Sequence, residues 1–241
     1  MAPPRATRRQ ESSQLSDADA IAHQKRQAAR AAAEEVEDGM RLGLGTGSTV
    51  AYLLPALAER GLRGLTCSAT SPATELLARE QGLEVRELDE LGELDLASDG
   101  ADQIDPQAWL IKGGGGAHTR EKIVARAARR FVVIASAEKA VERLAPPVPV
   151  ELIRFGVAST LSALAPARLR SGPEDGFRVS PDGGLIGDYH GPIGDPRELA
   201  ARLGATPGVI EHGLFPPEIV SLVLIAGEAG VERRLGARPE G

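Results

Sequence analysis

The hydrophobic positions of the chain alternate between short continuous apolar runs and stretches with helical spacing. Runs such as 65–70, 131–135 and 221–227 have the unbroken apolar character of strands buried on both faces of a sheet. Strands that alternate with helices of about 10–15 residues predict βαβ units, and hence a Rossmann-like, mostly parallel α/β sheet with helices on both faces. In chain order, we expect helices at 16–36, 46–58, 71–81 and 117–130, and strands at 41–45, 65–70, 84–88, 94–98, 131–135 and 221–227.

The pattern changes near Pro146 and Pro147, where a second set of shorter elements begins. Their order, β-α-β-β-α-β, resembles a small α+β domain of the split-βαβ, ferredoxin-like type. Its expected strands are 148–153, 176–180, 184–189 and 208–211, and its expected helices are 159–169 and 195–203. We therefore expect a main α/β domain of residues 16–145 and 214–241 and a smaller lid domain of residues 146–213. The cleft between two such domains is a natural ligand site.

The first fifteen residues differ in composition from the rest of the chain. Residues 1–15 are rich in Arg, Pro and Ser and contain no apolar stretch, so they are not a secretory signal. We expect a flexible tail, with an organellar transit peptide as the alternative. Ser16, followed by Asp17 and Asp19, has the pattern of a helix N-cap, which predicts that the first helix starts there.

Composition restricts the class of protein further. The 241 residues are 42% hydrophobic and 26% charged, as in globular proteins, and carry a formal net charge of −6. Net acidity and only 3% aromatic residues argue against nucleic acid as a partner. The apolar runs fall far short of the roughly 20 residues that span a bilayer, so we expect no membrane association. One cysteine, Cys67, forms no internal disulfide and suits the cytoplasm.

Glycines and hydroxyl residues gather between a strand and a helix, in Gly43-Leu-Gly45-Thr46-Gly47-Ser48-Thr49. The segment fails the dinucleotide fingerprint and the P-loop pattern, because Ser48 stands at the third glycine position and no Gly-Lys-Ser/Thr follows. Backbone N–H groups and hydroxyls at a helix N-terminus suit a phosphate dianion. The alternative is a tight turn whose hydroxyls only cap the helix.

Two further segments carry ionisable groups. Asp99-Gly-Ala-Asp102 ends a strand, where carboxylates can bind sugar hydroxyls or exchange protons; a divalent cation site or a plain turn are the alternatives. Lys112 precedes four glycines, which are costly to order unless a ligand approaches the backbone. Glu121, in the first turn of the next helix, is then a candidate general base, and Lys112 a candidate stabiliser of an enediolate. The alternative is a linker followed by solvated helix charges.

The lysines, histidines and single cysteine give little further indication of the chemistry. Only four of the 28 basic residues are lysines, and two of these, Lys112 and Lys122, lie in or beside the glycine run. His118 is expected at the surface or behind the site, and Cys67, inside an apolar strand, is expected to be inert. No Cys/His cluster has zinc spacing, so we expect no metal.

Taken together, the three segments resemble the A-type ribose-5-phosphate isomerase family. GLGTGSTV at 43–50, SDGADQID at 98–105 and KGGGGAHTREKIV at 112–124 are similar to its signature segments in their order, and PVEL at 149–152 and PGVIEHGLF at 207–215 are similar to later landmarks. The resemblance covers about residues 17–227. It implies interconversion of ribose 5-phosphate and ribulose 5-phosphate through an enediol(ate), in the non-oxidative branch of the pentose phosphate pathway. It implies no metal or nicotinamide cofactor, and a homodimer or homotetramer.

The resemblance also implies a set of site residues. The proton acceptor of the family falls on Glu121, and the reasoning above adds Asp99 and Lys112 as catalytic partners. The substrate-binding positions fall on Lys25, Thr46, Gly47, Ser48, Thr49, Asp99, Gly100, Ala101, Asp102, Lys112, Gly113, Gly114, Gly115 and Lys139.

The chain departs from the family pattern at four positions. Gln103 stands where an acid is usual, and His118 where an apolar residue is usual. Glu138 precedes the phosphate-binding Lys139, where a carboxylate would repel phosphate unless it turns away or pairs. Gly184 replaces an asparagine in the lid.

Two alternative functions stay open at this stage. One is a related enzyme on the same kind of sheet, such as an aminosugar-phosphate deaminase or a CoA-transferase; His chemistry or a glutamate nucleophile in another context would favour it. The other is a sugar-phosphate sensor without turnover, against which the presence of Glu121 and Lys112 argues.

Overall fold

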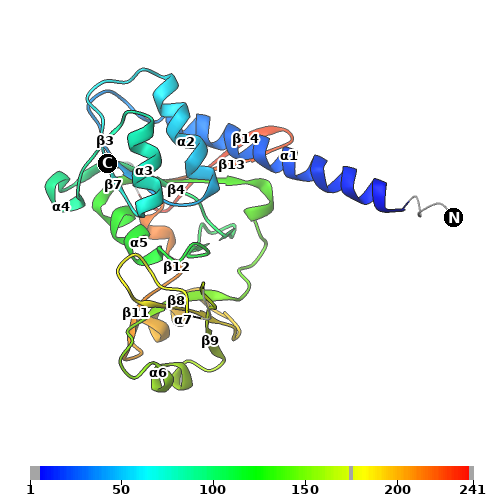
Figure 1. Ribbon diagram of the computed structural model, residues 1–241, viewed down its shortest axis with the longest axis vertical. Coiled ribbons are helices and arrows are strands. Elements are labelled where there is room, and N and C mark those ends of the chain that lie inside the picture. The colour runs from blue at the N-terminus through cyan, green and yellow to red at the C-terminus, as the bar shows by residue number, and fades with distance from the viewer. Residues whose placement is uncertain (1–5, 174–175, 239–241) are drawn as a thin grey trace.

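The protein, described by a computed structural model, is built around a seven-stranded sheet with the strand order β14-β13-β7-β4-β1-β2-β3 (Figure 1). The structure describes residues 6–173 and 176–238, and side chains from residue 17 onward. All neighbouring strands of this sheet are parallel except β13 and β14. The strands are β1 (Arg41–Leu44), β2 (Thr66–Ala69), β3 (Glu84–Val85), β4 (Leu94–Asp99), β7 (Ala128–Ser136), β13 (Leu222–Gly227) and β14 (Gly230–Leu235).

Helices cover both faces of the sheet, as the apolar runs predict. In β7, Val132 and Ile134 pack into one hydrophobic core, while Val133 and Ala135 pack into another on the opposite face. A strand buried on both faces needs apolar residues at every position, because successive side chains point to opposite sides. The first core lies under α1 (Ala6–Ala33), α2 (Ser48–Glu59) and α3 (Pro72–Glu80), and the second under α4 (Leu88–Leu91), α5 (His118–Ala127) and the 3-10 turn η2 (Pro217–Ile219).

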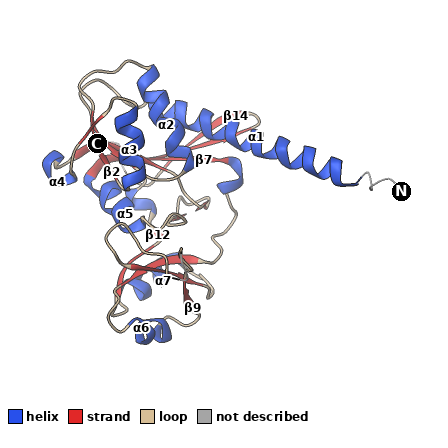
Figure 2. Ribbon diagram, in the orientation of Figure 1, coloured by secondary structure: helices blue, strands red, loops and turns tan. Residues whose placement is uncertain are grey.

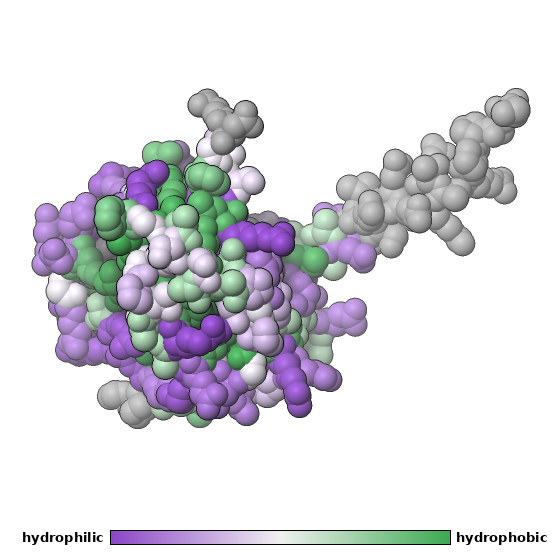
Figure 3. Space-filling model, turned by 90° about the horizontal axis from the view of Figure 1, so that it is seen from below, coloured by the Kyte–Doolittle hydropathy of each residue, from purple (hydrophilic) through white to green (hydrophobic). Residues whose placement is uncertain are grey.

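A separate four-stranded antiparallel sheet lies below the main one (Figure 2). Its chain order, β-α-β-β-α-β, confirms the split-βαβ expectation, and its strand order is β11-β8-β10-β9. It consists of β8 (Val148–Leu152), α6 (Val157–Ala163), β9 (Ala167–Leu169), β10 (Leu185–Tyr189), α7 (Pro196–Gly204) and β11 (Val209–His212). Seen from below, its side of the molecule has hydrophilic residues along the lower rim and more hydrophobic ones toward the middle (Figure 3). The domain boundaries at 146 and 213 stay a prediction.

Three short strands form a third sheet that the sequence analysis did not predict. They are β5 (Gln103–Ile104), β6 (Leu110–Ile111) and β12 (Leu214–Phe215), in the order β12-β6-β5. Two residues are too few to show an alternation of apolar and polar positions, so no periodicity marks them. The 3-10 turn η1 (Ala137–Lys139) follows β7.

The first helix begins earlier than expected. It starts at Ala6, so residues 6–15 of the expected flexible tail are helical, and that part of the prediction is wrong. No Pro or Gly interrupts residues 6–33, and a helix that already exists extends at little cost through such a stretch. Residues 1–5 of the expected tail lie outside the described residues.

Several other expected boundaries differ. The helix expected at 159–169 ends at Ala163, because Pro166 lacks the N–H that a helix interior needs, and β9 follows instead. The strand expected at 176–180 contributes only isolated bridges at Phe177 and Val179. The strand expected at 84–88 is limited to β3, with α4 after it, and α5 ends at Ala127, where β7 begins.

The strand order places the loops of two central strands at a switch in topology. From β1, the chain moves outward to β2 and β3 on one side, and then returns to β4, β7 and β13 on the other. Loops at the carboxyl ends of β1 and β4 therefore diverge, which opens a crevice where α/β proteins bind ligands. None of the helices in residues 6–173 and 176–238 has the length and apolar character needed to cross a membrane.

Candidate active site

The loop after β1 lies directly against the end of β4. The backbone N–H of Thr46 donates to Asp99 Oδ1 over 3.0 Å. A Cβ at Gly45 would lie 1.8 Å from Asp99 Cγ, so only glycine permits this approach. Gly47 has a φ of 93°, a left-handed conformation that glycine adopts without strain. Gly45 therefore permits close packing and Gly47 a sharp turn. A tight turn in this segment is one of the two interpretations of the sequence pattern.

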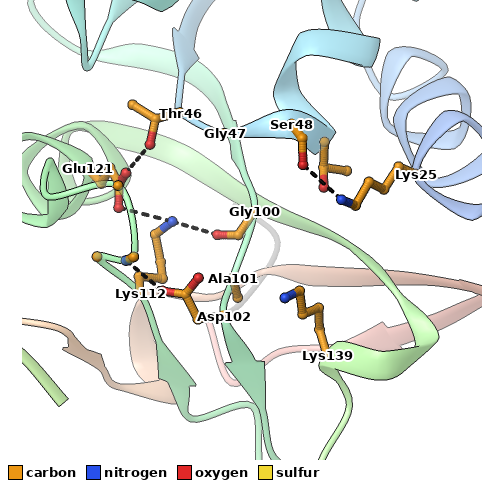
Figure 4. A pocket seen from close by; sticks show the side chains of 14 residues that line it. Lys25, Thr46, Gly47, Ser48, Gly100, Ala101, Asp102, Lys112, Glu121 and Lys139 are labelled. Atoms are coloured by element: carbon orange, nitrogen blue, oxygen red, sulfur yellow. Dashed lines mark hydrogen bonds and ion pairs between the residues drawn. The ribbon is translucent and has the colours of Figure 1, made fainter. Parts of the chain in front are cut away.

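A buried cluster of one lysine and two carboxylates occupies the crevice. Lys112 Nζ lies 2.8 Å from Asp99 Oδ2 and 3.2 Å from Glu121 Oε2. It also donates to the carbonyl oxygen of Gly100 over 2.5 Å. The exposed fractions of Asp99, Lys112 and Glu121 are only 3%, 3% and 4%. In this arrangement one ammonium group faces two carboxylates that are nearly cut off from water, as Figure 4 shows for Lys112 and Glu121.

Burial changes the proton affinity of this cluster. Desolvation raises the pKa of Asp99 to about 7; the Lys112 ammonium opposes the rise and the Glu121 carboxylate adds to it. Burial alone would lower the pKa of Lys112, but Asp99 and Glu121 more than offset it, so that this pKa lies above its ordinary value. Lys112 therefore stays charged, while the Asp99 carboxyl group can hold or release a proton near neutral pH.

Thr46 and the start of α5 hold the carboxylate of Glu121 in place. The Thr46 hydroxyl donates to Glu121 Oε1, as Figure 4 shows. Glu121 lies in the first turn of α5, and its backbone N–H donates to Ala117 O over 3.0 Å. A carboxylate near a helix N-terminus is stabilised by the aligned peptide dipoles. The carboxylate is thus held at one oxygen by the Thr46 hydroxyl and at the other by the Lys112 ammonium.

Two further lysines line the other side of the same cavity. Lys25 of α1 donates to Ser48 Oγ over 2.8 Å, and Lys139 of η1 extends toward the same space (Figure 4). Ser48 and Thr49 bring hydroxyls to the start of α2. Cations, hydroxyls and a helix N-terminus on one side of a cavity suit a phosphate group.

The sequence-predicted site residues come together in one cavity of about 160 Å³. All the predicted substrate-binding residues line it except Asp99, which lies behind Lys112. Asp102 lies at its edge and accepts from the Gly114 N–H over 2.8 Å. Across residues 6–173 and 176–238, no group of three or more His, Cys, Asp and Glu side chains is arranged to hold a metal ion.

None of the four residues that depart from the family pattern lines the cavity. The Glu138 carboxylate accepts from the Ser136 hydroxyl over 2.7 Å, and Gln103 exchanges hydrogen bonds with the backbone of Ala145. Gly184 packs against Glu151, where a Cβ would lie 2.2 Å from the carboxylate oxygen. His118 is fully buried rather than at the surface, with Nε2 3.4 Å from Glu211 O.

The side chains of Lys122 and Cys67 lie outside the cavity. Lys122, next to the candidate base, pairs with Glu211 over 2.7 Å and also donates to His212 O, so it ties α5 to β11. Burial raises the pKa of the Cys67 thiol to about 12, with a further contribution from Glu84. The thiol is therefore protonated at neutral pH, as expected for an inert cysteine.

The sequence analysis missed two arginines that contact the glycine run. Arg170 donates to Gly113 O and Gly114 O, and Arg178 donates to Gly115 O. Both arginines belong to the small sheet and its loops, 56 and more positions away in the chain. No local pattern marks them, because an arginine in a polar loop is ordinary.

The fold and the cavity define a class. A parallel sheet covered on both faces holds an acid–lysine cluster and a cationic pocket at the switch in its topology. This is the architecture of an α/β enzyme that acts on a small anionic molecule.

Comparison with known proteins gives the family within this class. The model of the family described as ribose 5-phosphate isomerase A (phosphoriboisomerase A) matches residues 66–230, and the chain belongs to this family. The ribose-5-phosphate isomerase A of Bradyrhizobium diazoefficiens is 45% identical over 237 residues, which covers 90% of this chain and 97% of that protein.

Solved structures of the family superpose on most of the chain. That of ribose 5-phosphate isomerase A from Methanocaldococcus jannaschii is 36% identical, with a TM-score of 0.83 over 88% of this chain and 98% of its own. A D-ribose-5-phosphate isomerase in complex with phospho-erythronic acid is also 36% identical, with a TM-score of 0.85 over 89% of this chain and 99% of its own. These likenesses confirm the fold class predicted from the sequence.

Proposed function

We propose that the chain interconverts D-ribose 5-phosphate and D-ribulose 5-phosphate by moving a proton between C2 and C1 through an enediol(ate). The observation that carries the proposal is the placement of the Glu121 carboxylate beside Lys112, on one side of a cavity whose other side holds Lys25 and Lys139. A carbon acid needs an oriented base and a nearby positive charge at the reacting end. A phosphate held at the far end supplies binding energy for positioning.

The proposed reaction moves one proton from C2 to C1 and another from the C2 hydroxyl to O1. Glu121 removes the proton from C2 of the open-chain aldose, the C1–C2 bond becomes double, and the carbonyl oxygen O1 becomes negative. Lys112 stabilises that charge, as its ammonium lies 3.2 Å from the base and stays protonated. The C2 hydroxyl proton passes to O1, Glu121 returns its proton to C1, and C2 becomes the ketone carbon. No atom is gained or lost overall.

The two aspartates have supporting roles in this proposal. Asp99, whose pKa lies near 7, can hold or release a proton next to Lys112. Asp102 lines the cavity and can accept from sugar hydroxyls, which assists opening of the furanose ring. The Gly100 and Ala101 residues between them leave room for the sugar carbons.

The complex of a relative with phospho-erythronic acid supports this assignment. That molecule carries a phosphate at one end and, at the other, a planar carboxylate that resembles an enediolate in shape and charge. Molecules that resemble a transition state bind more tightly than substrates do. A cavity with a lysine at one end and two more at the other accommodates both charges.

We expect Lys139→Ala to raise KM for ribose 5-phosphate by about 10- to 100-fold and to change kcat by less than about threefold. The ammonium would lose a charge-assisted hydrogen bond to phosphate, which is worth about 1.5–3 kcal/mol. Steady-state kinetics would measure the split. Arg143→Ala removes an exposed cation nearby as the control. A fall in kcat with KM unchanged would show that Lys139 does not bind the phosphate.

The decisive test of the function is formation of the ketose from ribose 5-phosphate, followed by absorbance in the presence of a chelator. We expect activity that persists in the chelator, and a preference for five-carbon over six-carbon sugar phosphates. Tight binding of ribose 5-phosphate without any turnover would overturn the proposal in favour of a sensor. Release of ammonia from an aminosugar phosphate would favour a deaminase instead.

The assembly and location of the chain belong to the same proposal. We propose a homodimer or homotetramer that acts in the cytoplasm, within the non-oxidative pentose phosphate pathway, with a sugar phosphate as the small-molecule partner. The family resemblance supports the assembly, and the net charge of −6 argues against nucleic acid as a partner. Light scattering on the purified protein would measure the oligomeric state.

A further inference from the structure

The carbonyl groups of the glycine run beside the cavity are held by arginines of the small sheet. Arg170 Nη1 donates to Gly113 O over 3.0 Å and to Gly114 O over 2.9 Å. Arg178 Nη2 donates to Gly115 O over 3.2 Å. Two consecutive peptide carbonyls therefore point to the same guanidinium group.

Arg170 is itself fixed by a carboxylate. Its Nε lies 2.9 Å from Asp188 Oδ2, and its Nη2 lies 2.5 Å from Asp188 Oδ1. Asp188 belongs to β10, which pairs with β9 just before Arg170. A two-point ion pair of this kind fixes the plane of the guanidinium as well as its position. The side chain of Arg170 thus meets the glycine run in one orientation.

The direction of these carbonyls decides where the N–H groups point. In a trans peptide, the C=O and the N–H of the next residue point in opposite directions. The Gly114 N–H, opposite the carbonyl that faces Arg170, donates to Asp102 Oδ2 at the edge of the cavity. The Gly115 N–H, opposite the second such carbonyl, has no hydrogen-bond acceptor among the described residues. It is a free donor on the side of the peptides that faces away from Arg170.

We infer that Arg170, held by Asp188, is a positioning residue that turns the peptides of the glycine run so that the Gly115 N–H can donate to the oxygen that becomes negative in the reaction. The inference rests on the proposed isomerase function. Arg170 does not line the cavity, so it acts through the peptides. Glycines are the residues that most need such an anchor, because their backbone is the most free. Donation to the carbonyls also polarises the peptides and strengthens their N–H groups as donors.

Arg170→Met, with Asp188→Asn as a second variant, tests the inference through two ligands. Phospho-erythronic acid carries negative charge at the reacting end, whereas ribitol 5-phosphate carries only hydroxyls there. We expect titration calorimetry to show a Kd for phospho-erythronic acid weaker by about 10- to 100-fold in Arg170→Met, with ribitol 5-phosphate affected by less than about threefold. In the same variant, kcat should fall by a similar factor while KM changes little. In Asp188→Asn, the Kd for phospho-erythronic acid should also weaken, but by a smaller factor, and the Kd for ribitol 5-phosphate should again change little.

The control is Arg168→Met, which removes an exposed arginine two residues earlier and should leave both affinities unchanged. Equal weakening of both ligands in Arg170→Met would show a merely structural role, and no weakening of either would also overturn the inference. If Arg170→Met fails to fold, Asp188→Asn and Arg170→Lys decide by the same comparison. Failure of the proposed function would be recognised by a different observation, because the unaltered protein would then produce no ribulose 5-phosphate at all.

Discussion

Replacement of Glu121 by glutamine is expected to lower kcat for ribose 5-phosphate by about 10³- to 10⁴-fold, with KM within about threefold of the original value. A positioned general base contributes a factor of this size, and the amide cannot accept the proton from C2. The amide keeps the shape of the side chain and can still accept from Thr46, so the cavity and its phosphate side stay intact. Steady-state kinetics in both directions would measure the effect.

An isotope experiment separates the proton transfer from other steps. In heavy water, the unaltered protein should exchange the C2 proton of ribose 5-phosphate for deuterium, and Glu121→Gln should lose this exchange along with turnover. Glu80→Gln, a change at the exposed end of α3, is the matched control and should retain full activity. Exchange at the original rate in Glu121→Gln would exclude this residue as the base.

Replacement of Lys112 by methionine is expected to lower both activity and stability. The change leaves Asp99 and Glu121 in a site only 3–4% exposed without their shared cation. Loss of one partner from a buried ion pair costs about 3–5 kcal/mol of unfolding free energy. Loss of a group that stabilises an oxyanion lowers kcat by about 10²- to 10³-fold. Urea unfolding and steady-state kinetics would measure the two effects.

A double variant distinguishes the two roles of Lys112. Adding Asp99→Asn to Lys112→Met removes one of the two uncompensated carboxylates, so part of the lost stability should return. Activity should not return, because the enediolate would still lack its cation. Arg129→Met, at an exposed cation, is the control for stability. Recovery of activity in the double variant would show that Lys112 serves the fold alone.

Much of the architecture follows from local patterns. Residues 131–135 and 221–227 predict strands buried on both faces, and the structure places them side by side in β7 and β13. The loops after β1 and β4 lie at one edge of the sheet, because the carboxyl ends of parallel strands meet there. Glu121, Lys112 and Asp99 do meet there. Sequence patterns predicted this much because each depends on neighbours within a few residues.

Errors in the predicted elements come from weak or mixed local signals. The tail at 6–15 has no apolar stripe, yet it continues the helix because nothing in it stops one. Strands of two residues, such as Leu214–Phe215, gain their partners only from other segments. Lys25 and Lys139 lie far apart in the chain and were assigned through the family resemblance alone. They line the same cavity because η1 packs beside α1.

Local patterns in the chain are enough to predict the layered α/β fold, the split-βαβ unit, the family and the residue types of the cavity, because periodicity and loop chemistry are local properties. How those residues are ionised and which contacts hold them depends on the folded arrangement of distant segments. The pKa of Asp99 depends on burial beneath other segments, and the contact of Arg170 with Gly113 joins residues 57 positions apart. Desolvation and long-range contacts exist only after the chain has folded, so no local pattern records them.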